Sequence, residues 1–150
     1  MSMHQTVRQS FPEMPARGAG DLPVLTLAYI GDTVFDLYVR TFLIHKLPTT
    51  AHCTHTAAAK IVCASGQTAA FRKVEPVLNE SELRVYHRGR NAHGGSVPKN
   101  ASVQDYRVAT GLEALIGHLY WTGQDGRLEE LMNIILEDYA DEQPQQLYES

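Results

Sequence analysis

The chain has 150 residues, of which 43% are hydrophobic and 20% are charged, and its formal net charge is −4. This composition is typical of one globular domain and argues against a disordered chain. No apolar run is long enough to predict a membrane span, the first residues lack the pattern of a signal peptide, and two cysteines are too few for a disulfide framework. We therefore expect a cytoplasmic protein.

The negative net charge is unevenly distributed along the chain. From Asp125 onward there are eight acids and one base, which leaves twelve bases against nine acids in residues 1–124. Between Arg84 and Arg107 there are five bases and one acid. A basic surface of this kind is compatible with nucleic-acid binding, in spite of the acidic C-terminal segment.

The first half of the chain predicts an arm followed by helices. Residues 1–21 contain two prolines and two glycines and few large apolar residues, which predicts a flexible N-terminal arm. A first helix is expected from about Pro23 to Lys46, because its apolar residues recur at helical spacing and Pro48 ends it. Residues 50–77 predict a second helix or a broken pair of helices.

Three more helices are expected in the second half, with a glycine-rich loop after the first of them. The helices cover about residues 81–90, 102–121 and 126–139, the loop covers 91–100, and residues 141–150 form a frayed acidic tail. No segment has the alternation of polar and apolar residues that is typical of a strand. The predicted fold class is therefore all-α, with one domain over residues 22–140.

Two carboxylates stand alone in apolar helical stretches. Asp32 follows Gly31 in the first helix, and Glu113 lies between Gly111 and Gly117 in the helix over 102–121. A carboxylate in such a helix needs a cation, a hydrogen-bond partner or a metal ion, and neighbouring glycines allow another helix to approach closely. The pattern predicts a shared acidic site where the two helices cross. The alternative is that each acid pairs with an arginine in the core.

Asp36 lies one helical turn after Asp32, on the same face of the first helix. Paired carboxylates can hold Mg²⁺, which prefers oxygen ligands and keeps several waters, so that room remains for a substrate phosphate. The alternative is that Asp36 is solvated or pairs with Arg40 at the next turn. The spacing alone leaves both interpretations open.

A second group of candidates flanks the predicted loop. Arg88, Arg90 and Asn91 precede it, and Lys99 lies near its far end. Arginine offers paired donors that suit phosphate, and asparagine adds a neutral donor. We expect these residues to bind the backbone of a nucleic acid rather than its bases; the alternative is an ordinary solvated helix end.

Three segments together resemble the ribonuclease III family. Residues 27–32, with the sequence Leu-Ala-Tyr-Ile-Gly-Asp, are similar to the signature helix of its catalytic domain. Residues 111–117 are similar to the second acidic helix of that domain. Residues 88–92, followed by 98–100, resemble Mini-ribonuclease III, the short family that lacks a double-stranded RNA-binding domain. The resemblance covers about residues 22–137, and the motifs occur in the family's order and spacing.

The resemblance implies an all-helical homodimer that uses Mg²⁺ to cleave double-stranded RNA. It also implies products with a 5′ phosphate and a 3′ hydroxyl, maturation of the 23S ribosomal RNA precursor, and a ribosomal protein as a candidate partner that presents the substrate. The family's catalytic and metal-binding carboxylates fall on Asp32 and Glu113, with Asp36 as a further candidate ligand.

Two positions depart from the pattern of full-length ribonuclease III enzymes. Those enzymes carry a glutamate where this chain has Ala28 and an aspartate where it has Thr110. This loss of carboxylates favours the alternative function, a non-catalytic RNA-binding or ribosome-assembly module on the same fold.

Overall fold

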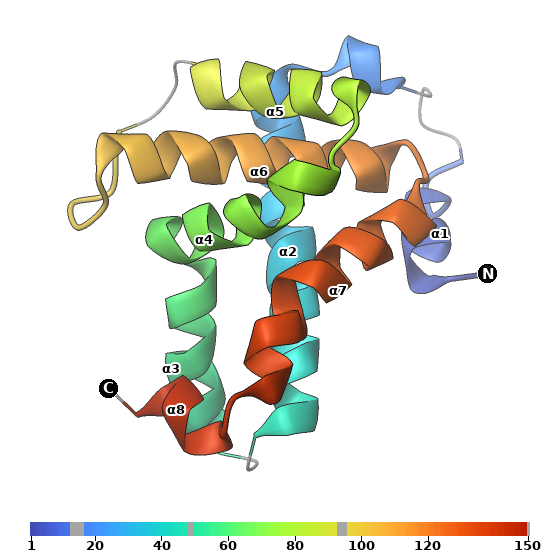
Figure 1. Cartoon of the computed structure of the whole chain (residues 1–150). Helices are drawn as coiled ribbons and strands as arrows, with labels where there is room; N and C mark the ends of the chain where they lie inside the picture. The colour runs from blue at the N-terminus through green and yellow to red at the C-terminus, as the bar shows by residue number, and fades with distance from the viewer. Residues whose placement is uncertain (13–16, 48–49, 93–95, 150) are drawn as a thin grey trace.

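The computed structural model describes residues 1–12, 17–47, 50–92 and 96–149, and all regular elements within these ranges are helices (Figure 1). The predicted all-α class is therefore confirmed. No helix in the described part of the chain is both long enough and apolar enough to cross a lipid bilayer.

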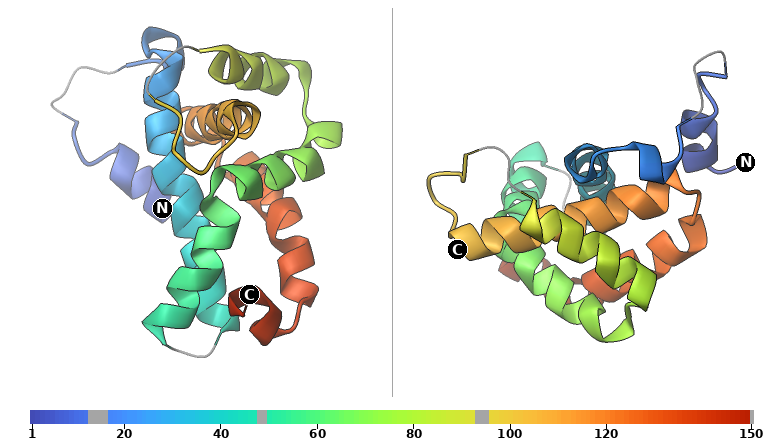
Figure 2. Two further views of the ribbon diagram at one scale, coloured as in Figure 1. Left: turned by 90° about the vertical axis from the view of Figure 1, so that its left-hand side faces the viewer. Right: turned by 90° about the horizontal axis from the view of Figure 1, so that it is seen from above.

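The central element is α6, which spans Val103–Trp121. It packs against α2 (Val24–Lys46), α4 (Ala64–Val74), α5 (Glu80–Asn91) and α7 (Asp125–Asp141). In Figure 1, α6 runs across the molecule and α2 passes behind it, and the view from above in Figure 2 shows α5 crossing over α6. Because α6 is apolar on almost all sides, it is stable only when other helices surround it in this way.

The hydrophobic core lies between α6 and the helices around it. Its fully buried side chains come from α2, α3, α4, α6 and α7; the largest are Phe35, Leu27, Leu43, Ile61, Leu112, Leu115, Ile116, Leu119, Leu128, Leu131, Met132 and Ile135. Burying side chains of this size contributes about 1.5–3 kcal/mol each, so the core fixes how α2 and α6 cross.

The segment 50–77 forms the broken pair of helices that was one of the two expectations. α3 spans Ala51–Val62, with the Thr50 hydroxyl accepting from the backbone N–H of Cys53. Cys63 has an extended backbone, with φ −66° and ψ 166°, and it ends α3 just before α4 begins. A short 3₁₀ turn at Glu75–Val77 follows α4.

Short helices lie within both of the terminal segments that were predicted to be a flexible arm and a frayed tail. α1, Met3–Arg8, lies inside the segment predicted to be a flexible arm, and a 3₁₀ turn at Ala19–Asp21 follows. The Arg8 guanidinium donates to both carboxylate oxygens of Asp125, at 3.0 and 2.9 Å. Near the C-terminus, α8 (Pro144–Tyr148) packs against α3 and buries Leu147. Residues 13–16 of the arm and residue 150 of the tail lie outside the described residues.

Candidate functional site at the crossing of α2 and α6

The two central helices touch backbone to backbone at a pair of glycines. A Cβ atom on Gly31 would overlap the carbonyl oxygen of Glu113 and would lie 2.7 Å from the Gly117 nitrogen. A Cβ atom on Gly117 would likewise overlap the carbonyl oxygen of Leu27. Only residues without a side chain permit this approach. The glycines therefore set the distance between the carboxylates beside them.

The crossing brings Asp32 and Glu113 together, as the sequence predicted. The carboxyl group of Glu113 is hydrogen-bonded to that of Asp32, and Asp32 itself is exposed to solvent. The pKa of Glu113 is raised from 4.5 to about 8, first by burial and then by the negative charge and the hydrogen bond of Asp32. Two carboxyl groups so close do not both ionise readily unless a cation lies beside them.

Within the described residues, neither Asp32 nor Glu113 forms the alternative ion pair with an arginine in the core. Among the described residues, the ion pairs that arginines form involve other acids, such as Glu82 and Asp125, and not Asp32 or Glu113. The Asp32–Glu113 pair thus has the character of a coupled acidic site that faces solvent through Asp32.

Asp36 is oriented toward a different neighbour. Its Oδ2 atom lies 3.0 Å from Nε of Arg40, which is the i,i+4 ion pair named as the alternative. Its Oδ1 atom is buried and has no hydrogen-bond partner. The geometry supports the ion pair between Asp36 and Arg40. Asp36 lies one helical turn from Asp32 and is not part of the coupled pair of Asp32 and Glu113.

Small residues fill the two positions where full-length ribonuclease III enzymes carry acids. Ala28 is buried against Val85 and Ala114, and the Thr110 hydroxyl donates to the carbonyl of Tyr106 at 2.9 Å. Within the described ranges, no group of three or more histidine, cysteine or acidic side chains is arranged to hold a metal ion. In the described part of the chain, the carboxylates available at the crossing are therefore those of Asp32 and Glu113.

The predicted RNA-binding residues lie on α5 and on the loop after it. Arg88, Arg90 and Asn91 are exposed in the last turn of α5, and Lys99 is exposed in the loop. The middle of the loop, residues 93–95, lies outside the described residues. These four residues are polar, mostly basic and exposed, and we refer to them together as the α5 basic face.

A second glycine contact lies between α5 and α6. A Cβ atom on Gly89 would lie 2.7 Å from Cβ of Ala114 and 2.9 Å from Cα of Gly111. Gly111 and Ala114 lie on either side of Glu113 along α6, while Gly89 lies between Arg88 and Arg90 on α5. Close packing therefore brings the C-terminal part of α5 against the stretch of α6 that carries Glu113.

One buried ion pair was not found by reading the sequence. Glu82, whose side chain is only 4% exposed, accepts from Nε and Nη2 of Arg127 at 2.8 and 2.9 Å. Its pKa is lowered, chiefly by the Arg127 hydrogen bond. The two residues are 45 positions apart on polar helices, and only the capping box of α5, formed by Asn79 and Glu82, gave a local signal.

Comparison with known proteins identifies the family of the chain. The Ribonuclease III domain model matches residues 25–124. Mini-ribonuclease 3 of Clostridium tetani is 42% identical over 78% of this chain and 78% of its own length. Mini-ribonuclease 3 of Staphylococcus aureus is 40% identical over 75% of this chain and 85% of its own length.

The fold also matches a solved structure. A crystal structure of a protein from Fusobacterium nucleatum superposes with a TM-score of 0.72, covering 79% of this chain and 95% of that one at 24% identity. At this identity the likeness concerns the fold alone. Together, the domain match and the relatives at about 40% identity show that the chain belongs to the ribonuclease III domain family and, within it, to Mini-ribonuclease 3.

Proposed function

We propose that this endoribonuclease cleaves double-stranded RNA at a Mg²⁺-dependent site formed by Asp32 and Glu113. The endoribonuclease activity follows from the family. The observation that carries the rest of the proposal is the coupled carboxyl pair, in which the charge of Asp32 contributes to the raised pKa of Glu113. The enzyme interpretation is therefore preferred to the non-catalytic RNA-binding module.

The donor set of the crossing fits a magnesium ion. Mg²⁺ is commonly held in proteins by one or two carboxylates, with waters and substrate phosphate in its remaining positions. Asp32 and Glu113 supply such a pair, and a divalent cation would offset the burial and the repulsion by Asp32 that together raise the pKa of Glu113. A bound ion of this kind polarises a phosphate oxygen and lowers the pKa of a water molecule.

The other proposed roles, substrate positioning and RNA binding, belong to different residues of the chain. Asp32, which is exposed, reaches toward the substrate, and Glu113 holds its position through the fixed backbone of α6. The α5 basic face binds phosphates and 2′-hydroxyls across the shallow minor groove. Attack of water on phosphorus in line with the 3′ oxygen would leave a 5′ phosphate and a 3′ hydroxyl.

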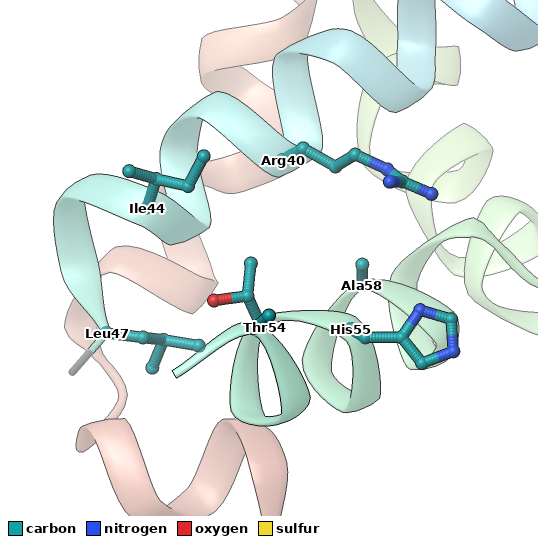
Figure 3. Close-up of a pocket in the computed structure, with 7 residues that line it drawn as sticks. Arg40, Ile44, Leu47, Thr54, His55 and Ala58 are labelled. Carbon is teal, nitrogen blue, oxygen red and sulfur yellow. The ribbon is translucent and has the colours of Figure 1, made fainter. Parts of the chain in front are cut away.

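An exposed apolar stripe on α2 supports a homodimer. Leu25, Tyr29, Leu37 and Ile44 lie on its outer side, with Tyr29 80% and Ile44 64% exposed. A groove of about 500 Å³ continues this surface between α2 and α3 (Figure 3). Exposed apolar surfaces of this kind mark interfaces. A two-fold dimer would place one site on each strand of a duplex.

The natural substrate we propose is the 23S ribosomal RNA precursor in the cytoplasm, with a ribosomal protein presenting it. Both follow from the family resemblance. We expect affinity for the RNA to come from the α5 basic face, and because its contacts are made to phosphates, this affinity should fall steeply with salt.

The direct test is to incubate the purified protein with a long RNA duplex, with and without Mg²⁺. We expect Mg²⁺-dependent shortening of the duplex, products that a 5′-phosphate-dependent exonuclease degrades, and light scattering that gives the mass of two chains. Cleavage of single strands alone, or cleavage that persists in EDTA, would contradict the proposal.

A further inference from the structure

Two of the contacts that orient α5 lie at opposite ends of the helix, on either side of the buried Val85 and Tyr86. Near its C-terminal end, Gly89 lies directly against Gly111 and Ala114 of α6. Near its N-terminal end, Glu82 is held by Arg127 of α7. Contacts near both ends of α5 constrain the direction of its axis, and this direction sets where each of its side chains points.

Arg127 anchors the N-terminal end of α5 through several hydrogen bonds. Its guanidinium makes two hydrogen bonds to the Glu82 carboxylate, and Nη2 also donates to the carbonyl of Val77 at 2.6 Å. Glu82 in turn accepts from the backbone N–H of Asn79 at 2.9 Å, which caps the helix. A single arginine therefore holds both the first turn of α5 and the segment that leads into it.

The same anchor neutralises the charge of the buried Glu82 carboxylate. His118 of α6 lies within electrostatic reach of both Glu82 and Arg88. If Arg127 were absent, the buried carboxylate would lack its main counter-ion. It would then attract the cationic groups on this side of the molecule, Arg88 among them.

We propose that Arg127 is a positioning residue for RNA binding: by holding Glu82, it fixes the direction in which α5 presents Arg88 and Arg90 to the phosphate backbone. Arg127 does not itself belong to the α5 basic face; it acts through Glu82. This inference rests on the proposed function, since it assumes that the α5 basic face binds duplex RNA.

The test compares Arg127→Met with a matched control, Arg8→Met. Arg8 also makes two bonds to one carboxylate, Asp125, and one to a backbone carbonyl, that of Tyr120. Asp125 begins α7, but the Arg8 contacts do not involve α5. Both substitutions remove two bonds to one carboxylate and one bond to a backbone carbonyl, and Arg127→Met also removes the exposed ion pair with Glu130. Only Arg127→Met releases the proposed RNA-binding helix.

The readouts are duplex RNA affinity as a function of salt, kcat at saturating RNA, and unfolding by urea. For Arg127→Met we expect about tenfold weaker binding, a salt slope reduced by about one, and a kcat within about twofold of wild type. For Arg8→Met we expect wild-type affinity and slope. Equal loss of affinity in both variants, or an unchanged slope in Arg127→Met, would overturn the inference.

A second variant covers the case in which Arg127→Met does not fold. Replacing both partners, as in Glu82→Leu with Arg127→Met, leaves no buried charge and commonly costs little stability. If positioning matters, this folded double variant still binds RNA weakly; if it binds like wild type, the inference is wrong. A wild-type protein that neither binds nor cleaves duplex RNA would instead refute the proposed function.

Discussion

Replacing Glu113 with glutamine should make the metal-free protein more stable at neutral and alkaline pH. In the folded protein the pKa of Glu113 is about 8, raised by burial and by Asp32, against 4.5 for the unperturbed group. Because the folded state disfavours the ionised form, the wild-type protein loses stability as the pH rises from about 4.5 to about 8. Above that range the penalty is constant, and below it the penalty is absent.

The size of the effect follows from the shift. Each pKa unit corresponds to about 1.4 kcal/mol, so the full shift gives an upper limit of about 5 kcal/mol. Solvent screening at the exposed Asp32 side of the pair reduces this to about 2–3 kcal/mol. Glu113→Gln removes the ionisation and keeps the shape, so it should gain this amount at about pH 8.5 and nothing at about pH 4.

The assay is urea unfolding at a series of pH values, in EDTA and in Mg²⁺. In EDTA the wild-type curve should fall below that of Glu113→Gln as the pH rises, and in Mg²⁺ the difference should shrink or reverse, because only the wild type binds the ion. Asp36→Asn is a control, since its partner is Arg40, and its curve should run parallel to wild type. Parallel curves for wild type and Glu113→Gln in EDTA would refute the coupling of Asp32 with Glu113.

Four further substitutions test other parts of the site. Asp32→Asn should keep the fold, and by light scattering the proposed dimer, but lower duplex cleavage about 10³-fold or more, and retained activity would remove Asp32 from the site. Gly117→Ala should cost about 3 kcal/mol in urea unfolding, because its Cβ overlaps the carbonyl of Leu27; a wild-type midpoint would contradict the backbone contact. Arg90→Ala should weaken duplex binding and reduce its salt slope by about one, whereas an unchanged slope assigns Arg90 a purely structural role. The lowered pKa of Glu82 means that its contribution to stability, complete above pH 4.5, is lost as the pH falls through its folded-state pKa, so Glu82→Gln should show a smaller acid loss than wild type.

Signals carried by neighbouring residues were sufficient to predict most of the helices. Pro23 and Pro48 bracket α2, which spans Val24–Lys46, and Ser102 caps α6 by accepting from the backbone N–H of Asp105. The break between α3 and α4 could not be located in this way, because cysteine at position 63 has no strong preference against a helix. The extended backbone at Cys63 lets α3 and α4 pack in different directions, which is a property of the tertiary structure.

The candidate site and its surroundings also contain one pair of residues that the sequence predicted and another that it did not. Asp32 and Glu113 could be paired from sequence because each is a lone acid beside glycine in an apolar helix, where a carboxylate needs a partner and the glycine admits a second helix. Glu82 and Arg127 could not be paired from the sequence, because charged residues on polar helices are usually solvated and their partners are set by the fold. The docking of α1 through Arg8 depends in the same way on a residue 117 positions away.

The glycine contact between α2 and α6 has a consequence for metal selectivity. Since the two backbones already touch at Gly31 and Gly117, neither helix has space to move toward the other. At the proposed Mg²⁺ site, a smaller ion would therefore have to be accommodated by rotation of the carboxylate side chains, chiefly that of Glu113, which has one more rotatable bond than Asp32. Discrimination between cations of different radius at this proposed site would then depend on the rotamers open to one glutamate.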